Sequence, residues 1–255
     1  MGRDNSQTTL WGHPFWEALC IPALVITHRL SYDLIGTILS KKGLNYGHFL
    51  VTSWDFEIPY IPFFILPYLF TWAYAAFIFF YAVICGTYDR QTFRYFYLSF
   101  IVLTGLECLL WYNFPASILI RASADMLSSS GFLGSLTAYV YERATPWNVI
   151  PSAHIAFAYI AWLFSKKFAP SGHRWFFLFL FFFISLSVVF IKNHYLVDIV
   201  GGVVLGHLVY TFVFLPASNR KILAGLSTIS ILVFHYLILA LAGVLYLAIL
   251  GTPWN

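Results

Sequence analysis

The stretch WFFLFLFFFISLSVVFIKNHYLVD, residues 175–198, joins a long apolar run to a short polar segment. The apolar run Trp175–Ile191 is followed, after a few residues, by a second run, Tyr195–Leu215. Runs of this kind approach the roughly 20 residues that an α-helix needs to cross a bilayer. His194 and Asp198 stand at the edge of the second run, where a membrane helix meets water. The stretch therefore predicts two membrane helices joined by a connection that carries ionisable residues.

The composition of the whole chain also favours a membrane protein. Of its 255 residues, 60% are hydrophobic and 9% are charged, whereas a soluble domain usually has about 25% charged residues. The net charge of +4 is spread over loops and does not favour a nucleic-acid partner. The predicted spans are Trp16–Leu39, Ile58–Gly86, Tyr95–Phe114, Pro151–Phe168, Trp175–Ile191, Tyr195–Leu215 and Ile222–Leu250.

We expect an all-α fold, a polytopic integral membrane helical bundle of roughly six or seven transmembrane helices. Residues 1–255 would form a single membrane domain with a catalytic core at about 58–215. Polar residues interrupt the first span, which either crosses the bilayer with them turned inward or lies partly in the interface. The segment 115–149 is expected to cover the site as a loop or interfacial helix. Gly202 and Gly206 form a small-xxx-small pair, which predicts close helix packing.

The charges of the loops predict the orientation. The short loops on one predicted face are basic and nearly free of acids; they hold Arg90, Arg94, Lys166, Lys167, Arg174, Arg220 and Lys221. Such loops normally stay in the cytoplasm. The two polar motifs then share the opposite face, which is periplasmic, extracellular or lumenal, and a plasma or inner membrane is the expected location.

Two short segments carry candidate chemistry. His194 and Asp198 are four residues apart, so they would share a face if the chain is helical from Tyr195 onward. The carboxylate can keep one imidazole nitrogen protonated and leave the other free to attack. Ser152 and His154 would open another helix, after a proline that suits the first turn. The unpaired N–H groups of that turn form a natural anion site.

Each motif alone has a simpler explanation, a hydrogen bond on a helix surface or an ordinary helix start. Together they flank consecutive spans on one membrane face, and ionisable groups there favour a functional site. His154, His194 and Asp198 also form a conceivable zinc triad. Arg121 and Lys192 would repel a cation, so we expect no metal and no other cofactor.

These residues resemble the type-2 phosphatidate phosphatase (lipid phosphate phosphatase) superfamily, which is related in fold to the vanadium haloperoxidases. The family pattern is K-x6-R-P, then P-S-G-H, then S-R-x5-H-x3-D. The second motif corresponds to Pro151-Ser152-Ala153-His154, and the third to Ser187, His194 and Asp198. The resemblance extends over about residues 58–215 and implies an all-helical core.

The departures from the pattern concern the phosphate-binding cations. Arg121 fits the arginine of the first motif, but Phe114 stands at its lysine and Ala122 at its proline. Val188 stands at the arginine of the third motif. Lys192, close to His194, could replace one missing cation. The runs Asp55-x-x-Ile58-Pro59 and Lys192–Tyr195 are more similar to the branch that includes inositol phosphorylceramide synthases.

The resemblance implies a role for each matching residue. His194 would attack phosphorus and form a phosphohistidine, and Asp198 would orient it. His154 would protonate the leaving oxygen and then activate water or an acceptor hydroxyl. Phosphoryl oxygens would be held by Arg121, Lys192, Ser152 and the N–H groups near Ala153.

The predicted function is that of a metal-independent lipid phosphatase that hydrolyses a lipid phosphate monoester or pyrophosphate at the non-cytoplasmic face. The expected partners are this lipid phosphate substrate and the surrounding membrane lipids. The sequence does not indicate the oligomeric state. One alternative is a lipid headgroup phosphotransferase with the same histidine, and another is a transporter without turnover.

Other polar residues lie within or beside predicted spans. Glu107, His207 and His235 could form a proton relay, although internal pairing is the simpler interpretation. His28 and Arg29 could anchor the interface by snorkelling. Asp55 either binds a headgroup or caps a loop.

Overall fold

The computed structural model describes residues 19–42, 48, 50–85, 87 and 89–216. Within them the regular elements are helices, and isolated β-bridges join His48, Ala116 and Asn148. The elements are α2 (Cys20–Lys41), α3 (Ser53–Glu57), η2 (Pro62–Phe64), α4 (Ile65–Ile84), α5 (Arg90–Asn113), α6 (Ala124–Ser129), α7 (Gly131–Arg143), α8 (Ala153–Phe168), η3 (Ser171–His173), α9 (Arg174–Phe190), α10 (Leu196–Val209) and η4 (Tyr210–Phe214). The prediction of an all-α membrane bundle is confirmed.

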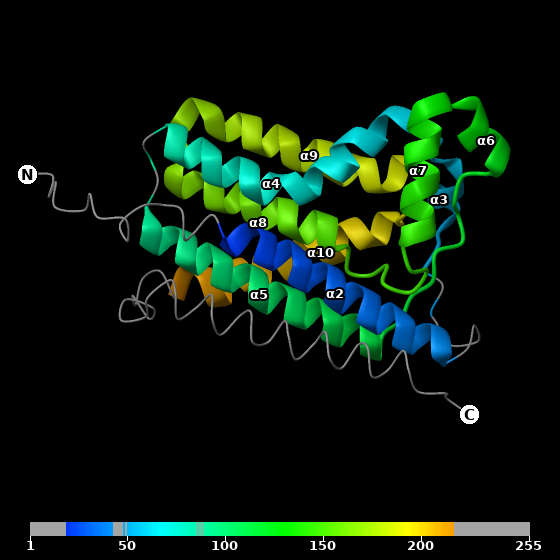
Figure 1. Cartoon of the computed structure of the whole chain (residues 1–255), viewed down its shortest axis with the longest axis horizontal. Helices are drawn as coiled ribbons and strands as arrows, with labels where there is room; N and C mark the ends of the chain where they lie inside the picture. The colour runs from blue at the N-terminus through cyan, green and yellow to red at the C-terminus, as the bar shows by residue number, and fades with distance from the viewer. Residues whose placement is uncertain (1–18, 43–47, 49, 86, 88, 217–255) are drawn as a thin grey trace, which may run out of the picture.

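Helix α8 lies at the centre of the bundle, in contact with α4, α5, α9 and α10 (Figure 1). Apart from His154, its sequence, AHIAFAYIAWLFSKKF, is mostly apolar on all sides until the last turn, as expected of a helix surrounded by others. Ala156, Ala158 and Ile160 are fully buried. Small side chains alternate with large ones along α8, so neighbouring helices can pack closely against it. This close packing holds the residues at the start of α8 in fixed positions.

The glycines of α10 lie against α8. A Cβ atom on Gly202 would come within 2.8 Å of the Ser152 carbonyl oxygen and of Ile155 Cβ, and one on Gly206 within 3.0 Å of the Ala156 carbonyl oxygen. Any larger residue would push the two helices apart. The predicted close packing at this small-xxx-small pair is confirmed.

The described residues contain fewer membrane spans than the six or seven predicted. Gln91–Asn113, Ser171–Phe190 and Leu196–Phe214 are long and apolar enough to cross a bilayer, and the bent pair Pro62–Tyr74 and Ala76–Ile84 could be a fourth span. Helix α8 has 16 residues, short of the roughly 20 of a full span. Helix α2 has 22 residues but carries Arg29 and Asp33 at mid-length. The predicted span Ile222–Leu250 lies outside the described residues.

One end of the bundle carries extra structure. The segment 115–149, predicted to be a loop or interfacial helix, contains α6 and α7, which lie across the end of the bundle where α8 and α10 begin (Figure 1). The short helix α3 lies at the same end. Both predicted motifs are therefore at the covered end of the bundle.

Candidate active site

His194 lies in the short connection between α9 and α10. The N–H groups of Asn193 and His194 both donate to the carbonyl of Val188, at 3.1 Å each, and hold this connection against the end of α9. Lys192 has φ = 54°, a left-handed conformation that is uncommon for a residue other than glycine. Such backbone strain is often found at functional sites.

The hydrogen bonds of His194 define its tautomer. Its Nδ1 atom lies 3.1 Å from Asp198 Oδ2 and 3.1 Å from the Val149 carbonyl oxygen. A carbonyl and a carboxylate can only accept, so Nδ1 must carry the proton. In the neutral ring Nε2 is then unprotonated and has a free lone pair. The Asp198 carboxylate also accepts the Tyr195 N–H, at 2.9 Å, and thereby caps α10.

The second histidine lies beside the first. The ring centroids of His154 and His194 are 5.9 Å apart in an edge-to-face arrangement. The His154 ring stacks on Tyr68 at 4.1 Å and contacts Trp72 at 5.2 Å. Its Nε2 atom is buried and has no hydrogen-bond partner among the described residues. A catalytic role is one explanation for a buried polar atom without a partner.

Ser152 links the two motifs. Its Oγ atom is 3.5 Å from His194 Nε2, at the outer limit of a hydrogen bond. Trp111 of α5 donates from Nε1 to the Pro151 carbonyl, at 3.1 Å, and fixes the turn before α8. The backbone N–H groups of the first helical turn, which begins at Ala153, have no partners within the helix. The motifs are thus assembled across 42 residues of sequence.

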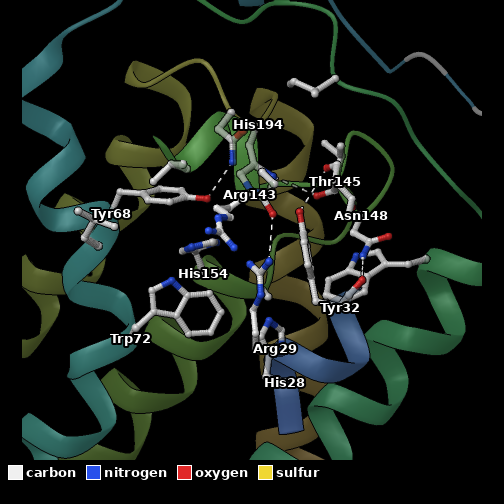
Figure 2. A pocket seen from close by; sticks show the side chains of 18 of the residues that line it. His28, Arg29, Tyr32, Tyr68, Trp72, Arg143, Thr145, Asn148, His154 and His194 are labelled. Carbon is white, nitrogen blue, oxygen red and sulfur yellow. Dashed lines mark hydrogen bonds between the residues drawn. The ribbon is translucent and has the colours of Figure 1, made fainter. Parts of the chain in front are cut away.

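A pocket of about 350 Å³ opens beside the two histidines (Figure 2). Its walls include aromatic side chains from α2, α4, α5 and α7, together with residues of α8 and of the segment that precedes it. The lining includes Tyr32, Tyr68, Trp72, Trp111, Tyr139, Ala153, His154, Asn193 and His194. A cavity with apolar walls and a few convergent polar groups is typical of a binding site for a small molecule or headgroup.

The predicted phosphate-binding cations Arg121 and Lys192 are not among the lining residues. Arg121 donates to the carbonyls of Tyr141, at 2.9 Å, and Ala144, at 3.2 Å, and its Nε is buried without a partner among the described residues. Lys192 Nζ donates to the carbonyl of Asp55, at 2.8 Å. Burial lowers the pKa of Arg121 and of Lys192. Both cations are therefore engaged with the backbone near the site.

Two other arginines line the pocket. Arg29 of α2 and Arg143 of α7 lie along the same cavity as His154 and His194 (Figure 2). Arg143 was not predicted to be a site residue, and Arg29 was predicted only to interrupt the first span or to anchor the interface. Neither belongs to a motif. The one available signal was the position of Arg143 in the longest non-spanning segment, beside the turn that leads to Ser152.

The other polar residues considered above have structural partners. The Asp55 carboxylate accepts the Thr52 N–H, at 2.7 Å, and the Leu196 N–H, at 2.8 Å, so it caps both α3 and α10. His28 is 3% exposed, so the snorkelling prediction was wrong for this residue. Its Nδ1 atom lies 3.6 Å from Glu107 Oε2, and neither atom has a hydrogen-bond partner among the described residues. His207 Nδ1 contacts the Tyr159 hydroxyl at 3.2 Å. His235 lies outside the described residues.

The zinc alternative has no geometric support in the part of the chain that the structure describes. No three His, Cys, Asp or Glu side chains there are placed to share a metal ion. Instead Asp198 contacts the imidazole nitrogen that faces away from Ser152. The arrangement is that of a histidine oriented by a carboxylate.

Comparison with known proteins identifies the family. A model of the PAP2 superfamily matches residues 43–212. The match includes both histidine motifs and the whole segment 115–149. Comparisons with curated proteins and with solved structures give no significant match. Since the family model covers more than half of the 255 residues, the chain belongs to the PAP2 superfamily, the type-2 phosphatidate phosphatases.

Proposed function

We propose that this protein is a membrane lipid phosphatase that forms a phosphohistidine on His194. Membership of the PAP2 superfamily supports phosphatase-type activity on lipid phosphates in general. The observation that carries the finer proposal is the geometry of His194. Its Nδ1 contacts two acceptors, while its Nε2 faces Ser152 and lies beside His154 at the pocket.

The reaction follows from the positions of the two rings. His194 Nε2 attacks phosphorus as the bond between phosphorus and the lipid oxygen breaks. Protonated His154 gives its proton to the departing oxygen. Neutral His154 then accepts a proton from water, whose oxygen attacks the phosphohistidine and releases inorganic phosphate. The Asp198 carboxylate stabilises the positive charge that develops on His194.

The surroundings of the two rings suit this chemistry. The open N–H groups at the start of α8 and the Ser152 hydroxyl can donate to phosphoryl oxygens. His154 is buried against Tyr68 and Trp72, which limits access of water to its ring. We place the site at the non-cytoplasmic surface, because the end of the bundle with the histidine motifs is opposite the basic loops.

Headgroup transfer is the second candidate. The pocket extends beyond the histidines to Tyr32, Trp111 and Tyr139, and a bare phosphate would leave these walls without contact. A phosphodiester with a polar headgroup would fill more of the space. The same phosphohistidine would then pass the phosphorylated headgroup to a lipid hydroxyl, with His154 as the base.

Purified full-length protein in detergent, supplied with a labelled lipid phosphate, tests the proposal. We expect release of inorganic phosphate and an acid-labile label on the wild-type protein. His194→Ala should abolish both, whereas Lys167→Gln, at the opposite end of the bundle, should change neither. Transfer of label to a second lipid would support headgroup transfer instead. Full hydrolysis by His194→Ala would refute the mechanism, and folded wild type without turnover on either substrate class would support the transporter alternative.

A further inference from the structure

The last turn of α7 is held by side chains from distant parts of the chain. Arg121 donates to the carbonyls of Tyr141 and Ala144, at 2.9 and 3.2 Å. Arg29 Nη2 donates to the carbonyl of Arg143, at 3.2 Å. These three carbonyls lie at the end of a helix and have no N–H partner in the next turn. Cationic donors stabilise such carbonyls and the negative end of the helix dipole.

The segment after α7 is held in the same way. The Tyr32 hydroxyl donates to the Thr145 carbonyl, at 3.2 Å, and Asn148 Nδ2 donates to the Tyr32 carbonyl, at 2.8 Å. Arg29 itself forms an ion pair with Asp33, at 2.8 Å. Helix α2 and Arg121 therefore fix the backbone on both sides of Arg143. The point from which the Arg143 side chain extends is fixed as a result.

The Arg143 side chain lines the pocket beside the histidines. Figure 2 shows Arg143, with Arg29 below it, in the cavity that His154 and His194 also line. The Arg143 guanidinium lies over the Tyr139 ring, 5.4 Å from its centroid. Among the described residues no carboxylate is within salt-bridge distance of it. The charge of Arg143 acts on Asp33, but that carboxylate forms its ion pair with Arg29. A guanidinium without a salt bridge of its own retains its capacity to bind a phosphate through two parallel hydrogen bonds.

The positions that carry cations in the family pattern cannot serve here. Val188 is completely buried in the core, and Phe114 is 61% exposed. Arg121 is committed to two carbonyls and lies outside the pocket lining, and Lys192 is committed to the Asp55 carbonyl. Phosphoryl transfer still requires cationic stabilisation of the equatorial oxygens. Arg143 is placed to provide it.

We propose that Arg143 binds the phosphoryl group of the substrate, and that Arg121 and Arg29 are positioning residues that act through it. This inference rests on the proposed function, because it assigns the phosphate of that reaction to a particular side chain. The inference also changes the role of Arg121, the one arginine that matches the first motif. Arg121 would hold the end of α7 in place instead of binding phosphate.

Binding of inorganic phosphate to full-length protein, measured by calorimetry in the His194→Ala background, tests Arg143 without turnover. Arg143→Gln should weaken binding at least 10-fold and, in wild type, lower kcat/KM about 100- to 1,000-fold, as loss of one transition-state donor does. Arg143→Lys should recover part of the affinity, because it keeps the charge but not the planar fork. Lys167→Gln is the charge-matched control. Unchanged phosphate affinity in Arg143→Gln would overturn the inference.

The positioning role is tested by a double-mutant cycle. Arg121→Gln alone should weaken phosphate binding, but in the Arg143→Gln background it should cause little further loss. Equal losses in both backgrounds would mean that Arg121 contacts phosphate directly. If Arg121→Gln does not fold, Arg29→Gln provides the same cycle through the Arg143 carbonyl.

The outcomes separate this inference from the proposed function. Phosphate binding that depends on Arg143, without any lipid phosphate hydrolysis, would support the site and refute the reaction. Hydrolysis that depends on His194, together with a phosphate affinity that does not depend on Arg143, would support the reaction and refute the assignment of Arg143.

Discussion

The imidazole of His194 contacts two oxygens that can only accept a hydrogen bond, and both are on the same ring nitrogen. One of these oxygens comes from the backbone of Val149, so the ring is oriented even without the carboxylate. The Asp198 carboxylate adds the negative charge that the proposed phosphohistidine, which is positively charged, would require. Orientation and charge stabilisation are therefore partly separate in this site.

Asp198→Asn separates the two effects. An asparagine retains a side-chain oxygen that can accept the Tyr195 N–H, so the helix start should persist. Its amide cannot provide the charge and favours the wrong imidazole tautomer. We expect a loss of about 100- to 10,000-fold in kcat, with thermal unfolding within a few degrees of wild type. Phosphate release within 10-fold of wild type would show that Asp198 is not needed for the chemistry.

Lys192 shows how a cation close to a nucleophile can be structural. Its Nζ atom donates to the Asp55 carbonyl, and burial lowers its pKa even though the Asp55 carboxylate acts in the opposite direction. Lys192→Met should cost about 1.5–3 kcal/mol of stability, since a hydrogen bond to a charged group is lost. Inhibition by inorganic phosphate should change less than 3-fold. If Lys192→Met lost more free energy of phosphate binding than free energy of unfolding, Lys192 would instead contact the phosphate.

At the level of elements, Asp55 joins two helix starts that are far apart in sequence. Its two carboxylate oxygens accept the Thr52 N–H of α3 and the Leu196 N–H of α10. Because α10 also carries Asp198, the position of the His194–Asp198 pair depends on this contact. The Asp55 carboxylate is fully buried and both of its oxygens accept backbone N–H groups. This explains why Asp55 does not line the pocket.

The contact between α8 and α10 gives a prediction at this scale. Gly202→Ala places a methyl group 2.8 Å from the Ser152 carbonyl oxygen, which the backbone must move to relieve. We expect a loss of about 1–3 kcal/mol and lower activity, because Ser152 and His154 shift together. The control is Gly105→Ala. An added Cβ there meets nothing within 4 Å, so this variant should be as stable as wild type or slightly more stable. Equal thermal unfolding of the two variants in detergent would contradict this packing.

The whole molecule is polarised along its long axis. The histidine motifs, α6 and α7 gather at one end, and the opposite end has the connection between α8 and α9 (Figure 1). Lys166 and Lys167 lie in the last turn of α8, next to that connection. A basic end and a site end at opposite ends of the bundle are what the positive-inside rule requires of a non-cytoplasmic active site.

Cysteine labelling tests this orientation. Ser129, in α6 at the site end, is exposed, and the native Cys85, next to the end of α4, is exposed at the other end. An impermeant maleimide applied to intact cells should label Ser129→Cys in a Cys85→Ser background, and should leave Cys85 of the wild type unlabelled until the membrane is opened. The reverse pattern would invert the orientation.

The sequence predicts those features that depend on neighbours along the chain. The apolar runs predict helices, because every backbone group in a bilayer must be paired internally. The interval of four residues predicts that His194 and Asp198 lie close together, and their Nδ1–Oδ2 distance is 3.1 Å, although His194 precedes the first residue of α10 and the two do not share a helix face. Gly202 and Gly206 predict a close helix contact for the same reason. The number of spans was less predictable, because α8 is buried by other helices and need not be as long as the bilayer is thick.

Only the tertiary structure decides which cation reaches the pocket. Arg121 matches a motif but donates to carbonyls 20 and 23 residues away, whereas Arg143 matches none and lines the pocket. The choice depends on where the unpaired carbonyls at the end of α7 lie relative to each guanidinium, and this is a property of packed helices. Local spacing determines the pairing of a histidine with its carboxylate. The direction of a long, flexible arginine is determined by the acceptors that other segments bring to it.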